Sequence, residues 1–197
     1  MITKAELLER SIKKFTQFGS KHVTLDQLAN ELGISKKTIY TFFDNKEDLI
    51  TSGVESLINE YKAYINEIVA NHDNDPILSV ILIYKRGFQY LRYFKPSFLF
   101  GLEKYYPNAS RLFDNFVEEL SNTKVYNLLE QAQELGHIKK EVNIKLIVKI
   151  YFFRIDNLVF KENNLFESYQ NEDLFKHMVI YNFKGIINSN YSNSYFD

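Results

Sequence analysis

The chain of 197 residues contains no cysteine, only three prolines and only seven glycines. The lack of cysteine excludes a disulfide scaffold, cysteine catalysis, and zinc or iron–sulfur sites with Cys ligands. Because glycine and proline are so few, an all-β sandwich or barrel, which needs frequent tight turns, is not expected. The four histidines are scattered and include no i, i+4 pair, so we expect no metal site either.

Long apolar runs are absent as well. The longest, Ile77–Tyr84, stops at two basic residues and is far shorter than the roughly 18 residues that predict a membrane span. The first eleven residues include two glutamates and no continuous apolar stretch, unlike a secretory signal. Together with the lack of cysteine, these features predict a cytoplasmic protein.

Motifs of the common enzyme classes are missing too. The sequence has no P-loop, no glycine-rich dinucleotide fingerprint and no nucleophile elbow, so we expect no catalytic residues and no cofactor. The formal net charge of −1 gives no bulk attraction to nucleic acid. Binding to DNA would therefore need a local basic patch.

Four helices are predicted in the first 70 residues. The first covers about residues 3–18 and ends near Gly19, because apolar residues recur there at a spacing of three to four. These inward residues are Ala5, Leu8, Ile12 and Phe15. The second helix begins with a capping box, in which Thr24 is the N-cap and Gln27 stands three residues on.

Gly33 ends this second helix, since glycine adopts the left-handed conformation of a helix end without strain. Ser35 can cap a third helix, with Ile39 and either Phe42 or Phe43 turned inward. Asn45 can cap a fourth helix that runs to about residue 70.

The polar segment 71–76, in which aspartate precedes proline, is the clearest break in the chain. Five longer helices are predicted after it, over about residues 77–94, 97–105, 108–135, 143–161 and 172–188. Polar residues 121–124 interrupt the apolar phase of the third, which leaves one helix or two open. The polar tail 188–197 is expected to fray. The fold prediction is thus all-α with about nine helices: an N-terminal domain 1–46, a connecting helix 46–70 and a larger helical domain 71–197.

The most informative segment, residues 24–50, reads TLDQLANELGISKKTIYTFFDNKEDLI. It combines a helix of about eight residues, a turn containing glycine and a second short helix, which is the pattern of a helix-turn-helix. Apolar residues on both helices can pack together, and small Ala29 permits close approach. The outer face of the second helix then carries lysines and hydroxyls, the groups that meet phosphates and base edges. Residues 10–46 contain seven basic and three acidic residues, so the local charge is positive.

Residues 5–50 resemble the N-terminal DNA-binding domain of the TetR/AcrR family of transcriptional regulators. The resemblance rests on the segments FTQFG (15–19), TLDQLANELGIS (24–35) and TIYTFFDNKEDL (38–49). It implies a three-helix DNA-binding domain followed by a helical effector-binding and dimerisation domain. It also implies a ligand-responsive homodimer, most often a repressor, that leaves a palindromic operator when it binds a small molecule. The alternative is a helical ligand-binding or protein-interaction module in which the helix-turn-helix serves only as scaffold.

The family pattern also implies roles for single residues. Thr24 would donate a hydrogen bond to a phosphate, and Tyr40 and Lys46 would hold the DNA backbone, although Tyr40 could instead pack against the first helix. Residues at or in the major groove would be Ser35, Lys36, Lys37, Thr38 and Thr41. Many family members have glycine where this chain has Lys37, so a long cation here adds a contact or changes how closely the helix docks.

The region after residue 76 is rich in aromatic residues, which form either a packed core or an apolar effector pocket with a few polar anchors. Predicted pocket residues are Tyr84, Phe88, Gln89, Arg92, Phe116, Tyr126, Asn127 and Arg154. Arg154 and Asp156 interrupt a helix that is apolar on nearly all sides, where a salt bridge, a pocket role and an interface role all remain open. Such a helix needs a partner surface, so we expect a homodimer formed by helices 143–161 and 172–188.

Overall fold

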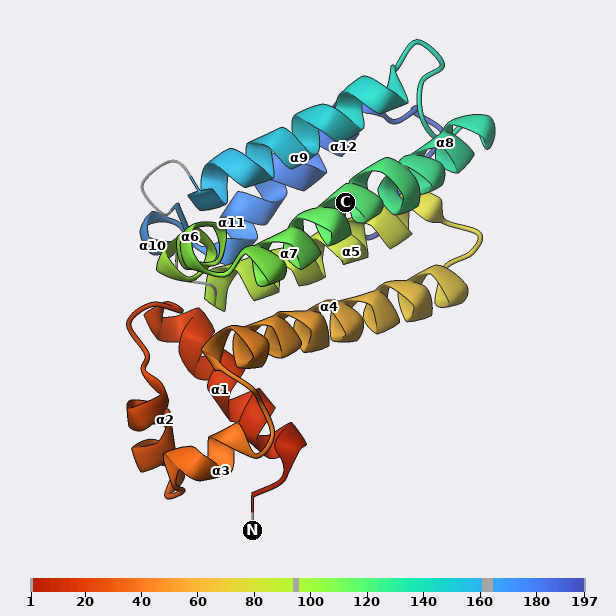
Figure 1. Cartoon of the computed structure of the whole chain (residues 1–197). Helices are drawn as coiled ribbons and strands as arrows, with labels where there is room; N and C mark the ends of the chain where they lie inside the picture. Colours follow the sequence, from red (N-terminus) through yellow and green to blue (C-terminus); the bar gives the residue numbers. More distant parts are fainter. Residues whose placement is uncertain (1, 94–95, 161–164, 197) are drawn as a thin grey trace. The chain divides into compact units, whose positions relative to one another are not determined.

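The computed structural model describes residues 2–93, 96–160 and 165–196, and the side chains of residues 92, 93, 96, 154–160 and 167 lie outside the described set. Its regular elements are helices, which confirms the all-α prediction (Figure 1). Counted as uninterrupted runs, the described residues form nine helices and the single turn α10. The elements are α1 (Lys4–Phe18), α2 (Leu25–Leu32), α3 (Lys36–Tyr40), α4 (Lys46–Asn71), α5 (Pro76–Tyr93), α6 (Pro96–Tyr105), α7 (Pro107–Glu119), η1 (Leu120–Val125), α8 (Tyr126–Glu134), α9 (Ile144–Phe160), α10 (Leu165–Ser168), α11 (Asn171–Phe175), η2 (Lys176–Ile180) and α12 (Tyr181–Ile186).

The chain divides into two compact units. Unit 1 consists of residues 1–61 and 93–116, and unit 2 consists of residues 62–92 and 117–197. The helices α4 and α7 each contribute residues to both units, and α5 contributes its last residue, Tyr93, to unit 1. The break predicted at 71–76 is present as the turn between α4 and α5, and the carboxylate of Asp75 caps α5 by accepting a hydrogen bond from the Leu78 amide at 2.9 Å.

The helix ends in unit 1 follow the predicted capping residues. Gly19 and Gly33 end α1 and α2 with φ angles of 89° and 64°, which glycine adopts without a side-chain clash. The inward face of α1 differs from the prediction: Leu7 and Ser11 are fully buried, whereas Ala5 is exposed and Leu8 half-buried. The assignment of Ala5 and Leu8 to the core was therefore wrong, because buried Ser11 makes the true core face look polar in the sequence.

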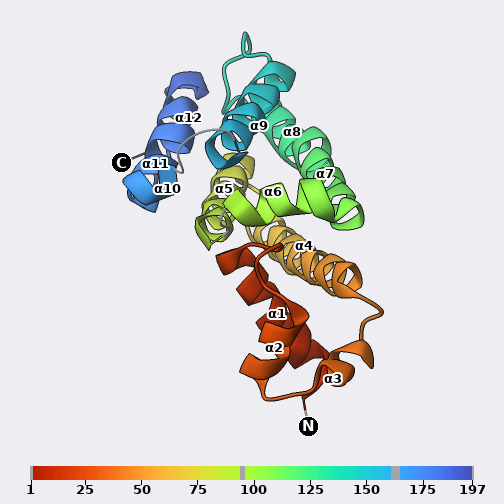
Figure 2. The same cartoon turned by 60° about the vertical axis from the view of Figure 1, so that its left-hand side comes forward.

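Helix α6 packs against the C-terminal end of α1 within unit 1 (Figure 2). The fully buried Ser20 accepts a hydrogen bond at its carbonyl from the Tyr106 phenol at 3.2 Å. Gly101 on α6 faces Ser20 so closely that a Cβ atom there would collide with the Ser20 hydroxyl oxygen. Any larger residue at position 101 would have to displace the buried Ser20 hydroxyl from its present position.

The segment with the interrupted apolar phase forms one continuous helix rather than two. Residues 120–125 adopt a π-helical turn, η1, between α7 and α8. A π turn inserts one extra residue and so rotates the following apolar face, which accounts for the phase change at residues 121–124. The last long helix contains a second such turn, η2, between α11 and α12.

The C-terminal tail is packed within unit 2, so the expectation that it frays was wrong. The phenol of Tyr191 donates a hydrogen bond to Asp75 at 2.6 Å and its ring lies 4.7 Å from that of His137. Burial, and secondly this hydrogen bond, raises the pKa of Tyr191. Lys85 donates a further hydrogen bond to the Tyr195 phenol at 3.1 Å. The tail is held by residues distant in sequence.

Candidate nucleic-acid interface

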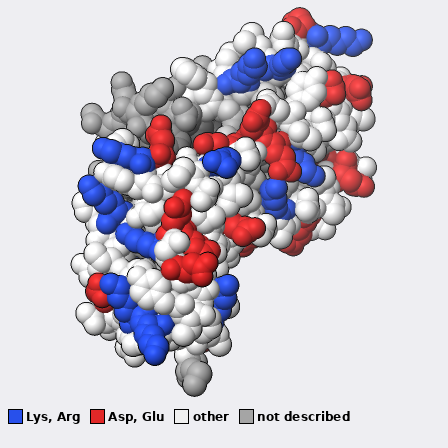
Figure 3. Space-filling model, in the orientation of Figure 1, with Lys and Arg blue, Asp and Glu red and all other residues white. Residues whose placement is uncertain are grey.

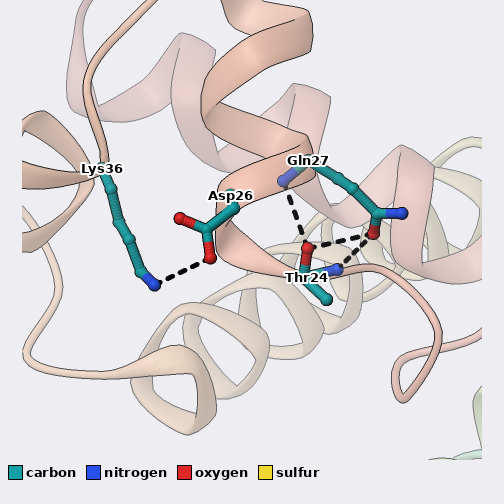
Figure 4. Close-up of polar contacts among 4 residues, drawn as sticks. All are labelled: Thr24, Asp26, Gln27 and Lys36. Carbon is teal, nitrogen blue, oxygen red and sulfur yellow. Dashed lines mark hydrogen bonds and ion pairs between the residues drawn. The ribbon is translucent and has the colours of Figure 1, made fainter.

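The helices α2 and α3 form the predicted helix-turn-helix in unit 1. The hydroxyl of Thr24 accepts a hydrogen bond from the Gln27 amide at 3.2 Å, and the Gln27 side chain accepts one from the Thr24 amide at 2.8 Å (Figure 4). This reciprocal capping box fixes the start of α2. Ser35 caps α3 in the same way by accepting a hydrogen bond from the Thr38 amide at 3.0 Å.

The third helix has one buried face and one open face. Ile39 is 1% exposed, and Leu28 and Ala29 of the neighbouring α2 are buried as well. Phe43, rather than Phe42, is the phenylalanine that turns inward. The open side carries Lys36, Lys37, Tyr40 and Thr41, which are all exposed. Tyr40 is 48% exposed, so about half of its side chain faces solvent. Short as it is, α3 is anchored in the core and presents donors to solvent.

The first turns of α2 and α3 are joined by an ion pair. The ammonium group of Lys36 lies 2.9 Å from a carboxylate oxygen of Asp26 (Figure 4). This hydrogen bond, and the charge of Asp26, raises the pKa of Lys36, so the side chain is a cation at neutral pH. Lys37 follows Lys36 directly, and no ion pair of Lys37 is found among the described residues.

Lys46 begins the fourth helix, which Asn45 caps as predicted by accepting a hydrogen bond from the Asp48 amide at 2.9 Å. Its side chain is half-buried within unit 1. The ammonium group lies 5.6 Å from the centre of the Phe15 ring and 5.7 Å from that of Tyr106. Burial lowers the pKa of Lys46. The sequence did not predict these two ring contacts, because Tyr106 is distant from Lys46 in the chain.

Basic side chains are prominent on this part of unit 1. In the view of Figure 3, blue Lys and Arg atoms lie over the region that α1–α3 occupy in Figure 1, and red Asp and Glu atoms border them. The hydroxyl groups on the same segment are already engaged locally. Thr41 donates to the Thr38 carbonyl at 2.7 Å, and Thr24 donates to the Gln27 side chain at 3.1 Å. Both hydroxyl groups thus have an acceptor within three residues of their own position.

The residues predicted to line an effector pocket are distributed over both units. Tyr84 and Phe88 are buried in unit 2 within an aromatic cluster. Tyr84 lies 6.0 Å, ring centre to ring centre, from Tyr151 and from Phe152, and Phe88 lies 5.9 Å from Phe175. The pocket prediction omitted Phe175, because the apolar pattern of its helix is typical of packed core.

Four other predicted pocket residues, Gln89, Phe116, Tyr126 and Asn127, lie outside this aromatic cluster. Gln89 and Asn127 are exposed, and half-exposed Tyr126 donates a hydrogen bond to Glu130 at 2.7 Å. Phe116 belongs to unit 1, where its ring packs edge-on against Tyr61. The side chains of Arg92, Arg154 and Asp156 lie outside the described residues.

Two negative findings concern the part of the chain that the structure describes. No helix there is long and apolar enough to cross a membrane. In the same residues, no group of three or more His, Asp or Glu side chains is arranged to hold a metal ion.

Known proteins share both the local sequence and the fold. Residues 7–52 match the family described as bacterial regulatory proteins, tetR family. The HTH-type transcriptional regulator YhgD of Bacillus subtilis (strain 168) is 44% identical over 61 residues, which are 31% of this chain and about a third (32%) of YhgD. IcaR of Staphylococcus aureus (strain Newman), an HTH-type negative transcriptional regulator of the biofilm operon icaADBC, is 26% identical over 140 residues, 71% of this chain and 67% of IcaR.

The solved structure of NemR from E. coli in its reduced form has the same fold. It superposes with a TM-score of 0.74 at 14% identity, over 95% of this chain and 98% of NemR. The likeness thus extends over the helices of both units, whereas the match in sequence is strongest in the helix-turn-helix. The chain belongs to the TetR family of helix-turn-helix regulators: it is a DNA-binding transcriptional regulator and not an enzyme.

Proposed function

We propose that this regulator is a homodimeric repressor that leaves a palindromic operator when a small apolar or aromatic molecule binds to it. The observation that carries the proposal is the two-sided character of α3. Ile39 holds the helix in the core, and the cations and hydroxyls of its other side are exposed. A helix of this kind fits the major groove, whose base edges present both acceptors and donors.

The exposed groups divide by chemistry into two sets. Lys36, Lys37 and Thr41 read base edges, since lysine reaches guanine acceptors and a hydroxyl suits several bases. Ser35 and Thr38 line the groove beside them. The remaining residues hold the sugar–phosphate backbone: Thr24, Tyr40 and Lys46. Phosphate contacts fix the position of the protein on the duplex, and base contacts select the sequence.

The dimer is formed by α9 and by the helix that comprises α11, η2 and α12. Support comes from large apolar side chains that stay exposed on these helices. Phe153 is 66% exposed, Leu146 53% and Tyr181 52%. Isologous two-fold pairing covers such faces and presents two copies of α3 to a palindrome, with half-sites about 34–36 Å apart or more if the DNA is deformed. Because it acts on chromosomal DNA, the protein works in the cytoplasm.

The effector binds in unit 2, among the aromatic rings around Tyr84 and Phe88. A flat aromatic ligand would make with these rings the same offset and edge-to-face contacts that the rings make with one another. Helix α4 carries the signal, since it begins beside α3 in the chain and its residues 62–71 belong to unit 2. A ligand shifts the equilibrium only by its difference in affinity for the two states. The negative regulation in the name of IcaR supports repression as the direction of control.

The test has three parts. Selection of duplexes from a random pool should yield a palindromic site, and analytical ultracentrifugation should show a dimer both free and on that site. A screen of apolar and aromatic metabolites should then find a compound that releases the DNA. A selected site without two-fold symmetry would contradict the dimeric reading, and a compound that tightens binding would reverse the proposed direction of control.

A further inference from the structure

A carboxylate lies beside the foremost cation of the recognition helix. Asp26 is the second residue of α2, and Lys36 is the first residue of α3. Their charged groups are 2.9 Å apart, with side chains that are 67% and 43% exposed (Figure 4). The pair thus lies on the surface that the proposed function turns toward DNA, where a negative charge is expected to weaken binding.

The backbone that carries this pair is held by two helix caps, whereas the two side chains of the pair are free to change conformation. Capping by Thr24 and by Ser35 fixes the first turns of the two helices. Both side chains, by contrast, are long or exposed, and ion pairs of this kind stabilise a protein only weakly. Lys36 can therefore leave Asp26 for a stronger acceptor without disturbing α2 or α3. Asp26 also stands in the first turn of α2, where the helix dipole favours a carboxylate, so its neutralisation removes only a small stabilising contribution.

On this basis we infer that Asp26 is a specificity-determining residue. It holds the Lys36 ammonium group in an ion pair until an acceptor on a base edge takes the place of the Asp26 carboxylate. This inference rests on the proposed function of α3. On DNA of arbitrary sequence, Lys36 gains only a phosphate contact, and the bared carboxylate of Asp26 is repelled by the same phosphates. At the operator, Lys36 gains a directed contact to a base in addition. The carboxylate therefore penalises non-specific binding more than operator binding.

Neutralising Asp26 makes Lys36 available to any phosphate. Each additional phosphate contact steepens the dependence of log affinity on log salt by about 0.9. Over the tenfold change from 1 M to 0.1 M salt, this difference in slope raises the affinity of the variant relative to the wild type by a factor of about eight. We expect Asp26→Asn to bind a scrambled duplex several-fold more tightly at low salt, whereas its operator affinity changes by less than about twofold.

The chain offers a matched control. Glu31, also on α2, pairs with Lys14 at the same distance of 2.9 Å and similar exposure, but its partner belongs to α1 and not to α3. Glu31→Gln removes the same charge from the same helix. Fluorescence anisotropy should be measured for the wild type, Asp26→Asn, Glu31→Gln and Asp26→Glu on the selected operator and on its scrambled form, over a series of salt concentrations.

The expected result is a several-fold loss of the operator-to-scrambled affinity ratio in Asp26→Asn alone, with the wild-type ratio kept by Asp26→Glu. The loss should also vanish in a Lys36→Met background, because the freed ammonium group causes it. An unchanged ratio, an equal loss in Glu31→Gln, or a loss that persists without Lys36 would overturn the inference. If the wild type itself does not distinguish operator from scrambled DNA, the proposed function of α3 fails as well, so the two failures are distinguishable.

Discussion

Lys46 has both a packing role and a proposed phosphate contact, and methionine at this position would separate them. The ammonium group lies 5.6 and 5.7 Å from the centres of the Phe15 and Tyr106 rings. Two partly exposed cation–π contacts contribute about 1–2 kcal/mol together. In Lys46→Met, sulfur–aromatic contacts of about 0.3–1.5 kcal/mol replace them, and no charge has to be partly buried. We expect the free energy of unfolding to stay within about 1 kcal/mol of the wild type.

Lys46→Ala is the matched comparison. It removes three methylene groups that are about half-buried, in addition to the cation–π contacts, and should lose about 2–3 kcal/mol of stability. Both variants lose the same charge. Both should therefore show a salt dependence of DNA binding that is shallower by about 0.9 in slope, irrespective of DNA sequence.

The assays are urea denaturation for stability and fluorescence anisotropy at several salt concentrations for DNA binding. Equal stability losses in the two variants would show that the methylene groups of Lys46 do not pack against the rings of Phe15 and Tyr106. A wild-type slope in both variants would refute the phosphate contact. A loss confined to one DNA sequence would instead place Lys46 among the base readers.

Three further predictions concern different parts of the chain. Thr41→Ala should weaken discrimination at one or two base pairs by about 1–3 kcal/mol, measured by competition with singly substituted operators; a uniform loss would contradict a base contact. Gly101→Ala should lower the free energy of unfolding by about 1–3 kcal/mol through its collision with Ser20, whereas Gly185→Ala, with no neighbouring atom within 4 Å, should raise it by up to about 1 kcal/mol. Tyr191→Phe removes a hydrogen bond to a carboxylate and should cost about 1.5–3 kcal/mol in thermal denaturation; an unchanged melting temperature would show that the tail is not held by this bond.

The helix-turn-helix was readable from sequence because its signals are local. A capping residue, such as Thr24 or Ser35, acts on an amide three positions away, and Gly33 meets the requirement of its own backbone. The anchoring of α3 by Ile39 follows from the same short-range periodicity. Such features depend little on the rest of the chain, so a single sequence suffices to predict them.

Features that depend on distant contacts were misread. The face of α1 was assigned by hydrophobicity, which overlooked the buried Ser11 and so displaced the core face from Leu7 to Leu8. The tail looked free because Tyr191 and its partner Asp75 are 116 residues apart. The ion pair of Lys36 is likewise invisible in a linear sequence.

Sequence-selective binding by α3 is the central claim, and one titration tests it most directly. The purified protein should be titrated onto labelled DNA from upstream of its own gene, and onto a scrambled duplex, at near-physiological salt. The account predicts an affinity for the upstream DNA that exceeds that for scrambled DNA by about a thousandfold or more. Equal affinities for the two duplexes at every salt concentration, also with an operator selected from a random pool, would contradict it.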